Sequence, residues 1–208
     1  MLNALTEKER MEGWKLLFDG ETLNGWDATG NKEGWTVDEE EKAILCLAKG
    51  GGYLYTLEQF DDFILKIDFK IDPGVNSGIF FRWSDLSDPV NTGLEMQILD
   101  TYGKENPGKH DCGALYDLVP PKVNAVKPAG EWNHVVITCK GPFITIDMNG
   151  QRIIDVNIDE WDTPGMNPDG TKNKFKYAWK DLPKRGHIGL QDHGGKVWFR
   201  NIKIKPLR

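Results

Sequence analysis

The chain has 208 residues and a net charge of −6, from 26 Lys and Arg against 32 Asp and Glu. This length suits one large β domain, and an acidic chain lacks the basic stripe that nucleic-acid-binding proteins carry, so nucleic acid is not an expected partner. Eight Trp and 23 Gly favour β structure with many turns. No apolar run approaches the roughly 20 residues that span a membrane, and the N-terminal segment lacks the apolar stretch of a signal peptide.

The first predicted element is a short helix that begins after Thr6, because Glu9 completes a capping box and Gly13 supplies the stop. Strand-like segments then recur about every 8–12 residues, with turn-forming residues between them. We expect strands at residues 14–18, 35–38, 43–48, 51–56, 62–71, 77–82, 94–99, 113–118, 134–140, 143–148, 151–156, 187–192 and 197–204. This spacing indicates a sandwich or barrel rather than βαβ units.

One stretch, residues 157–185, interrupts the strands with a long run rich in Pro, Gly and Lys. Long loops in compact β domains are often functional, and a surface flap without a chemical role is the alternative. The segments 84–92 and 101–112 also have the composition of loops. Because no linker or repeat is visible, we predict a helical extension over residues 1–12 and a single domain over residues 13–208 that contains the insertion at 157–185.

Polar side chains on the predicted strand 94–99 provide the first candidate site. Glu95 and Gln97 lie two residues apart, so they share one face and line either solvent or a cleft. Asp100 comes five residues after Glu95, and a regular strand places it on the opposite face, so only a bulge would complete the carboxylate pair of a conventional glycosidase. We predict Glu95 as a catalytic residue and Gln97 and Asp100 as substrate contacts.

Arg82 and His193 are the other two candidates for catalysis. Arg82 ends an apolar strand, so its charge needs a partner or an open groove, and a salt bridge is the alternative. His193 follows Gln191 and Asp192 in a Gly-rich turn, and histidine exchanges protons near neutral pH. A purely structural polar turn is the alternative there. We predict Gln191 and Asp192 as substrate contacts beside His193.

The loop that contains His110 mixes groups that can bind a metal ion or a sugar. His110 and Asp111 are candidate metal ligands, as is Asp192, and a divalent metal ion is the candidate cofactor. Tyr116 and Lys122 are candidate substrate contacts, since two prolines precede Lys122 and would hold its ammonium group in place. The cysteines lack the spacing of a zinc site, and we expect them in the core.

A family resemblance is carried by seven segments: LFDGETLNGW (17–26), the run from DFILKIDFKI to NSGIFFR (62–82), LEMQILD (94–100), CGALYD (112–117), EWNHVVI (131–137), MNG (148–150) and GLQDHGGKVWFRNIKI (189–204). Together they resemble the DUF1080 family, also described as the 3-keto-disaccharide hydrolase domain, over nearly the whole chain from about residue 13. The resemblance implies an all-β, concanavalin A-like jelly roll of two packed antiparallel sheets with a concave, sugar-binding face. It also implies a periplasmic or secreted protein, while the lack of a signal peptide leaves the cytoplasm open.

The activity that the resemblance implies is the cleavage of glycosides whose sugar carries a ketone at C3. A C3 ketone acidifies the C2 proton, so a base can remove it, the C1 leaving group can depart, and water can add to complete a hydrolysis. This route needs one base, one enolate stabiliser and one proton donor, rather than two matched carboxylates. Glu95, His193 and Arg82 fit it, with Arg82 or a divalent metal ion beside the enolate, and the expected partner is an oligosaccharide or glycoside substrate.

Two other functions remain open at the level of the sequence. Jelly rolls host many non-catalytic carbohydrate-binding modules, and such a fold also serves as an interaction domain in surface assemblies. A lectin needs flat, exposed aromatic rings, for which Trp83, Trp179 and Trp161 are the candidate platforms. An enzyme should instead gather Glu95 and His193 in one cavity with a perturbed titratable group.

Overall fold

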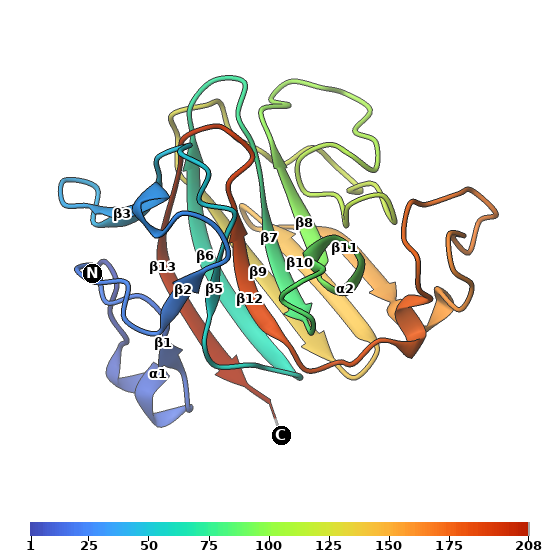
Figure 1. Ribbon diagram of the computed structural model, residues 1–208, viewed down its shortest axis with the longest axis horizontal. Helices are drawn as coiled ribbons and strands as arrows, with labels where there is room; N and C mark the ends of the chain where they lie inside the picture. The colour runs from blue at the N-terminus through green and yellow to red at the C-terminus, as the bar shows by residue number, and fades with distance from the viewer. Residues whose placement is uncertain (208) are drawn as a thin grey trace.

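Two antiparallel β-sheets pack against each other in the computed structural model, which describes residues 1–207 (Figure 1). The eight-stranded sheet consists, in spatial order, of β11 (Gln151–Asn157), β10 (Phe143–Met148), β9 (Asn133–Lys140), β6 (Phe63–Ile71), β13 (Val197–Pro206), β4 (Ala43–Cys46) and β3 (Trp35–Asp38), with β1 (Lys15–Leu16) paired to β13. The five-stranded sheet consists, in spatial order, of β2 (Trp26–Ala28), β5 (Tyr53–Thr56), β12 (His187–Gln191), β7 (Asn76–Trp83) and β8 (Leu94–Leu99). The predicted all-β sandwich is confirmed.

The core lies between the two sheets and follows from strict alternation along the strands. In β6 the buried residues are Phe63, Leu65, Ile67, Phe69 and Ile71, while the residues between them are partly exposed. Successive side chains of a strand point to opposite faces, so one face of β6 enters the core. The five-stranded sheet contributes to the same core cluster Ile79, Phe81, Met96, Ile188 and Leu190. The other face of the five-stranded sheet is therefore free to carry polar residues.

A short helix, α1 (Glu7–Met11), precedes the sandwich, as the capping box predicts. The Thr6 hydroxyl accepts a hydrogen bond from the Glu9 amide at 3.1 Å, and the Glu9 carboxylate accepts one from the Thr6 amide at 2.9 Å. Lys203 on β13 donates to the same carboxylate and lowers the pKa of Glu9 to about 2. These contacts dock α1 on the eight-stranded sheet. No helix among the described residues is long and apolar enough to cross a membrane.

Left-handed backbone conformations correct two predicted strands. Residues 113–118, predicted as a strand, form a loop with isolated bridges, because Gly113 and Asp117 have φ values of +88° and +61°. The backbone at these residues lies outside the β region, and the segment forms isolated bridges instead of a ladder. The strand predicted at 51–56 starts two residues later, because Gly52 also has a positive φ.

Other differences concern short elements. The prediction lacks the edge strand β2 and the helix α2 (Pro89–Thr92), which lies within the polar segment 84–92. The predicted turn at Asn149 and Gly150 is confirmed, since both residues have positive φ and join β10 to β11.

The insertion at 157–185 runs from the end of β11 to β12 and contains two 3₁₀ turns, Ile158–Glu160 and Trp179–Asp181. In Figure 1 it is the orange loop at the right-hand side. Phe175 and Trp179 from this loop are buried in the core cluster. The insertion is therefore packed against the sandwich along part of its length, and it can hold side chains in fixed places.

Candidate functional site

A cavity lies on the face of the five-stranded sheet that points away from the core. Residues of β7, β8 and β12 line it together with the segment around Tyr116 and the loop 157–185. The enclosed part of the cavity is small, about 70 Å³, and about 420 Å³ of space is free when the open mouth is included. Its lining consists of Asn76, Val90, Gly93, Glu95, Gln97, Tyr116, Lys174, Phe175, Gln191 and His193.

Glu95 enters this cavity from β8. Because Met96 points into the core, the residues on either side of it, Glu95 and Gln97, share the cavity face. Burial raises the pKa of Glu95 to about 8, against the opposing effect of the positive charge on Lys174. On the adjacent strand β7, Gly78 leaves room for the carboxylate, since a Cβ there would collide with Glu95 Oε1. A carboxyl group with this pKa can both take and give a proton near neutral pH.

Two glutamine side chains bring unpaired acceptors to the cavity lining. Gln97 donates its side-chain N–H to the His110 carbonyl at 3.2 Å, and Gln191 donates to the Tyr53 hydroxyl at 3.4 Å. The Oε1 atoms of both glutamines are buried and have no hydrogen-bond partner within residues 1–207. Buried polar atoms are normally paired, so these oxygens favour a ligand that supplies hydroxyl donors, as a sugar does.

Two tyrosines surround the same carboxyl group. Burial raises the pKa values of Tyr53 and Tyr116, and the negative charge of Glu95 adds to the shift in both. The Tyr116 amide also donates to the Glu95 carbonyl at 2.9 Å, which ties the loop of Tyr116 to β8. Both phenols are therefore protonated at neutral pH, and Tyr116, which lines the cavity, can donate a hydrogen bond to a ligand there.

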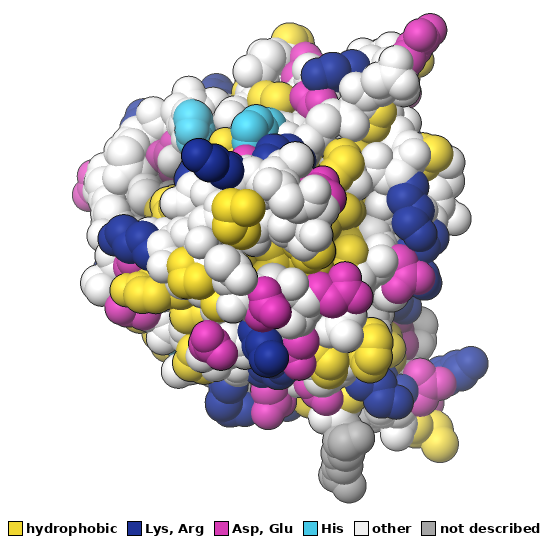
Figure 2. Space-filling model, turned by 90° about the vertical axis from the view of Figure 1, so that its right-hand side faces the viewer, with side chains coloured by type: hydrophobic (Ala, Val, Ile, Leu, Met, Phe, Trp, Pro, Cys, Tyr) yellow, Lys and Arg dark blue, Asp and Glu magenta, His cyan; other side chains and the backbone are white. Residues whose placement is uncertain are grey.

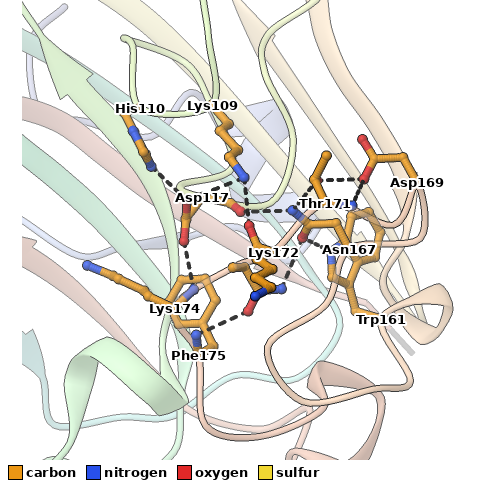
Figure 3. A network of polar contacts seen from close by, with 11 residues as sticks. Lys109, His110, Asp117, Trp161, Asn167, Asp169, Thr171, Lys172, Lys174 and Phe175 are labelled. Atoms are coloured by element: carbon orange, nitrogen blue, oxygen red, sulfur yellow. Dashed lines mark hydrogen bonds and ion pairs between the residues drawn. The ribbon is translucent and has the colours of Figure 1, made fainter.

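Lys174 supplies a cation to the cavity, and it comes from the loop 157–185. Its ammonium group lies 4.7 Å from the centroid of the Tyr116 ring, in a cation–π contact. Its backbone N–H donates to Asp117 Oδ2 at 2.8 Å, and Figure 3 shows this contact within a polar network that holds the loop. The sequence analysis did not identify Lys174 as a site residue, because the loop has no periodicity. The only sequence feature that could have indicated it is the high lysine content of the loop.

His193 is exposed and lines the cavity from the turn that follows β12. Asp192 shapes this turn, because its carboxylate accepts hydrogen bonds from the Gly51 amide at 2.8 Å and the Gly194 amide at 2.9 Å. Asp192 itself is not part of the cavity lining, so it supports the turn. Figure 2 shows histidine side chains gathered beside Lys and Arg side chains near the top of one face of the molecule.

Arg82 does not reach the cavity, which corrects its predicted placement beside Glu95. Its guanidinium group is buried, donates to the carbonyls of Asp61 at 2.9 Å and Gly141 at 2.7 Å, and pairs with Asp62 at 3.1 Å. The salt-bridge alternative therefore describes this residue. Its charge ties β7 to the turn between β9 and β10.

Asp100 and Lys122 also lie outside the cavity lining. The Asp100 carboxylate accepts a hydrogen bond from the Gly74 amide at 2.8 Å, and β7 and β8 pair in regular register without the bulge that would turn it toward Glu95. Lys122 donates its backbone N–H to the Ile153 carbonyl and lines a separate surface groove. Neither residue is placed to contact a ligand bound at Glu95.

The tryptophans predicted as sugar platforms are buried. Trp83 is fully buried, and its indole N–H donates to the Asp85 carbonyl at 2.6 Å. Trp161 and Trp179 are each only 5% exposed. None of the three presents an open ring face, which a lectin platform requires.

The predicted metal ligands have other partners. His110 Nε2 lies 2.6 Å from Asp117 Oδ1, and Asp111 pairs with Lys104 at 2.7 Å. Among residues 1–207, no group of three or more His, Cys, Asp or Glu side chains is arranged to hold a metal ion. The donor set around His110, Asp111 and Asp192 therefore does not fit a divalent cation.

Comparison with known proteins gives the same family as the sequence motifs. The model of the 3-keto-alpha-glucoside-1,2-lyase-like domain matches residues 13–205. A 3-keto-disaccharide hydrolase from Bacteroides thetaiotaomicron is 29% identical over 233 residues, which cover 94% of this chain and 79% of that protein.

Solved structures support the assignment of the fold. A protein from Parabacteroides distasonis ATCC 8503, assigned as a glycosyl hydrolase, superposes with a TM-score of 0.83 and 32% identity over 93% of this chain and 99% of its own. The carbohydrate-binding module CBM66 from Bacillus subtilis has a TM-score of 0.51 at 16% identity over 86% of this chain and 94% of its own, which shows a shared fold alone. The chain therefore belongs to the family of 3-keto-alpha-glucoside-1,2-lyase-like domains.

Proposed function

We propose that the protein hydrolyses glycosides whose sugar carries a ketone at C3, through elimination and water addition. The observation that carries this proposal is the position of Glu95, a carboxyl group with a pKa raised to about 8 on the wall of an open cavity lined by polar side chains. A general base is most effective when its pKa lies near the working pH. The C2 proton beside a ketone is acidic enough for such a base.

The reaction starts when the ionised Glu95 removes the C2 proton and leaves an enolate at C2, C3 and the keto oxygen. The C1–O bond then breaks as the enolate collapses, and His193 gives a proton to the departing alcohol. Water next adds its oxygen to C1, and its proton returns to His193. Glu95 finally gives its proton back to C2, so the balance is one water consumed, one 3-keto sugar and one alcohol released.

Lys174 takes the enolate-stabilising role that the sequence analysis gave to Arg82. Its ammonium group lines the cavity near enough to Glu95 to oppose the shift of its pKa. A fixed cation near a developing enolate is worth about 3 kcal/mol in the transition state. The Lys174 ammonium lies over the Tyr116 ring, and the hydroxyl of this tyrosine is a second donor for the same oxygen.

The remaining lining fits the rest of the sugar. The unpaired Oε1 atoms of Gln97 and Gln191 accept hydroxyl donors, whereas a keto oxygen is an acceptor and must face Lys174 or a tyrosine. Two other functions have less support. A conventional glycosidase needs a second carboxylate, but Asp100 is bound to the Gly74 amide, and the three tryptophans predicted as lectin platforms are buried.

The test is the release of nitrophenol from a 3-keto-glucoside and from its unoxidised parent, each as the α and β anomer and each with and without EDTA. We expect cleavage of a keto substrate alone, unchanged by EDTA, and a loss of at least about 100-fold in kcat for Glu95→Gln. Exchange of the C2 proton in D₂O, followed by NMR, should accompany it. Equal cleavage of the parent glycosides, or binding of the keto sugar without any cleavage, would contradict the proposal.

A further inference from the structure

We propose that Asp117 is a positioning residue, whose carboxylate fixes the loop 157–185 so that the Lys174 ammonium group stays at the cavity. The kinetic part of this inference rests on the proposed function. Asp117 does not line the cavity, but it follows Tyr116, which does, and it contacts the backbone of Lys174 directly. It joins two segments that are more than fifty residues apart in the sequence.

The contacts of Asp117 converge from both segments (Figure 3). Its Oδ2 accepts the Lys174 backbone N–H at 2.8 Å, and its Oδ1 lies 2.6 Å from His110 Nε2 and 3.7 Å from Lys109 Nζ. Only 10% of the side chain is exposed. A carboxylate with few routes to solvent and several donors has one favoured position, so it fixes the donors as well.

The backbone of Asp117 holds the same loop at a second point. Its carbonyl accepts a hydrogen bond from Asn167 Nδ2 at 3.4 Å, and Asn167 Oδ1 accepts the indole N–H of the buried Trp161 at 2.9 Å. The backbone N–H of Asn167 also donates to the Thr171 carbonyl at 2.7 Å. The loop is therefore anchored before Lys174 as well as at Lys174.

The position of the Lys174 ammonium follows from this anchorage. The group is exposed, and its nearest described contact is the face of the Tyr116 ring, which alone does not fix a flexible side chain. Asp117 has a left-handed backbone, with φ of +61°, and it and Tyr116 both contact Lys174: the Asp117 carboxylate accepts the backbone N–H, and the Tyr116 ring lies beneath the ammonium group. One residue of the turn thus faces the ligand while the next holds the cation above it.

Two variants separate the carboxylate from the backbone conformation. Asn and Gly both tolerate a left-handed backbone, so Asp117→Asn keeps an acceptor without the charge, and Asp117→Gly removes the side chain. The matched control is Asp100→Asn, because Asp100 also accepts a backbone N–H at 2.8 Å but lies outside the cavity lining. Each variant is first checked for its thermal midpoint.

The decisive measurement is a double-mutant cycle with Lys174→Met on the 3-keto-glycoside. In the wild-type chain we expect Asp117→Asn to lower kcat about tenfold. In the Lys174→Met chain the same substitution should lower kcat less than about twofold. The control Asp100→Asn should change kcat less than about twofold. A purely structural role would give equal losses in both backgrounds. Equal losses would therefore overturn the inference.

A second readout does not depend on catalysis. In the unliganded Asp117→Gly variant, the backbone amides of peptides that contain Lys174 should exchange their hydrogens faster than in the wild type, while those of β6 should exchange at the same rate. In the control Asp100→Asn, exchange should not change in either region. Unchanged exchange at Lys174 would overturn the inference even if the enzyme is active. If the wild-type protein cleaves no keto-glycoside, the proposed function fails, and the exchange result still decides whether Asp117 holds the loop.

Discussion

At the scale of single residues, the protonation of Glu95 decides which way the first proton moves. A base acts only when it is ionised, so kcat/KM should rise about tenfold per pH unit and level off near the pKa of about 8. Lys174→Met removes the charge that opposes the shift, so the midpoint should move to higher pH in that variant. A pH–rate profile for both proteins tests this, and a midpoint of the rising limb that does not move in Lys174→Met would contradict the assignment of Glu95 as the base.

The same residue should make stability depend on pH. The folded chain holds the Glu95 proton up to a pKa of about 8, whereas the unfolded chain releases it near 4.5. The contribution of Glu95 to the free energy of unfolding therefore falls as pH rises from 4.5 through 8. We expect the thermal midpoint of Glu95→Gln to rise relative to that of the wild type as pH increases from about 5 to about 9. Calorimetry at several pH values checks this, and a constant difference would mean that Glu95 is not buried as described.

Single residues also show how far a sequence can predict a site. Alternation placed Glu95 beside Gln97, and the structure brings Gln191 and His193 to the same cavity. Arg82 was misplaced because its partner, Asp62, is twenty residues away, just before a strand of the other sheet, and the sequence pattern does not reveal contacts between the sheets. Lys174 was missed because its place depends on a contact with Asp117 across the fold.

At the scale of elements, the pairing of β7 with β8 makes the space in which Glu95 lies. Gly78 stands opposite Gln97 and has no left-handed backbone, so alanine is compatible with the strand itself. We expect Gly78→Ala to keep the fold but to displace the Glu95 carboxylate, with a loss of at least about tenfold in kcat. Gly108→Ala is the control, because a Cβ there meets ordinary contacts. Steady-state kinetics and circular dichroism of both variants test this prediction. Full activity in Gly78→Ala would show that the Glu95 carboxylate can be displaced without loss of catalysis.

Elements were predictable where the side-chain pattern alone determines them. The strand expected at 62–71 is β6, Phe63–Ile71, because five buried residues alternate along it. The strand expected at 113–118 is absent, because Asp117 takes a left-handed backbone that composition does not reveal. The edge strand β2 has only three residues, too few for alternation to identify.

At the scale of the whole molecule, the two sheets carry different tasks. The outer face of the eight-stranded sheet is covered by its own side chains: the Lys70 ammonium lies 4.8 Å from the Trp198 ring, and the Arg200 guanidinium lies 3.9 Å from Trp132. The cavity opens on the opposite side of the sandwich, on the five-stranded sheet. The spacing of strands predicted a sandwich, but which sheet faces the ligand depends on long-range pairing, which strand spacing does not reveal.

This division predicts that the N-terminal segment contributes to stability and not to activity. Asn3 and Asn201 exchange hydrogen bonds at 2.8 and 2.9 Å, and Asn3 donates to the Lys42 carbonyl. Deletion of residues 1–12 removes these three bonds, worth about 1 kcal/mol each, together with the partly buried contact of Glu9 with Lys203. None of residues 7–11 is buried, so no core is opened. Urea denaturation should therefore show a loss of about 2–4 kcal/mol.

The kinetic arm of the same experiment tests the division itself. Because the segment docks on β13, at the far side of the sandwich from Glu95, kcat/KM of the shortened chain should stay within about twofold of the wild type below its unfolding temperature. Asn201→Ala should lose part of the same stability without any deletion. A shortened chain that stays folded but loses activity would show that the two sheets are coupled, and that the cavity depends on the sheet behind it.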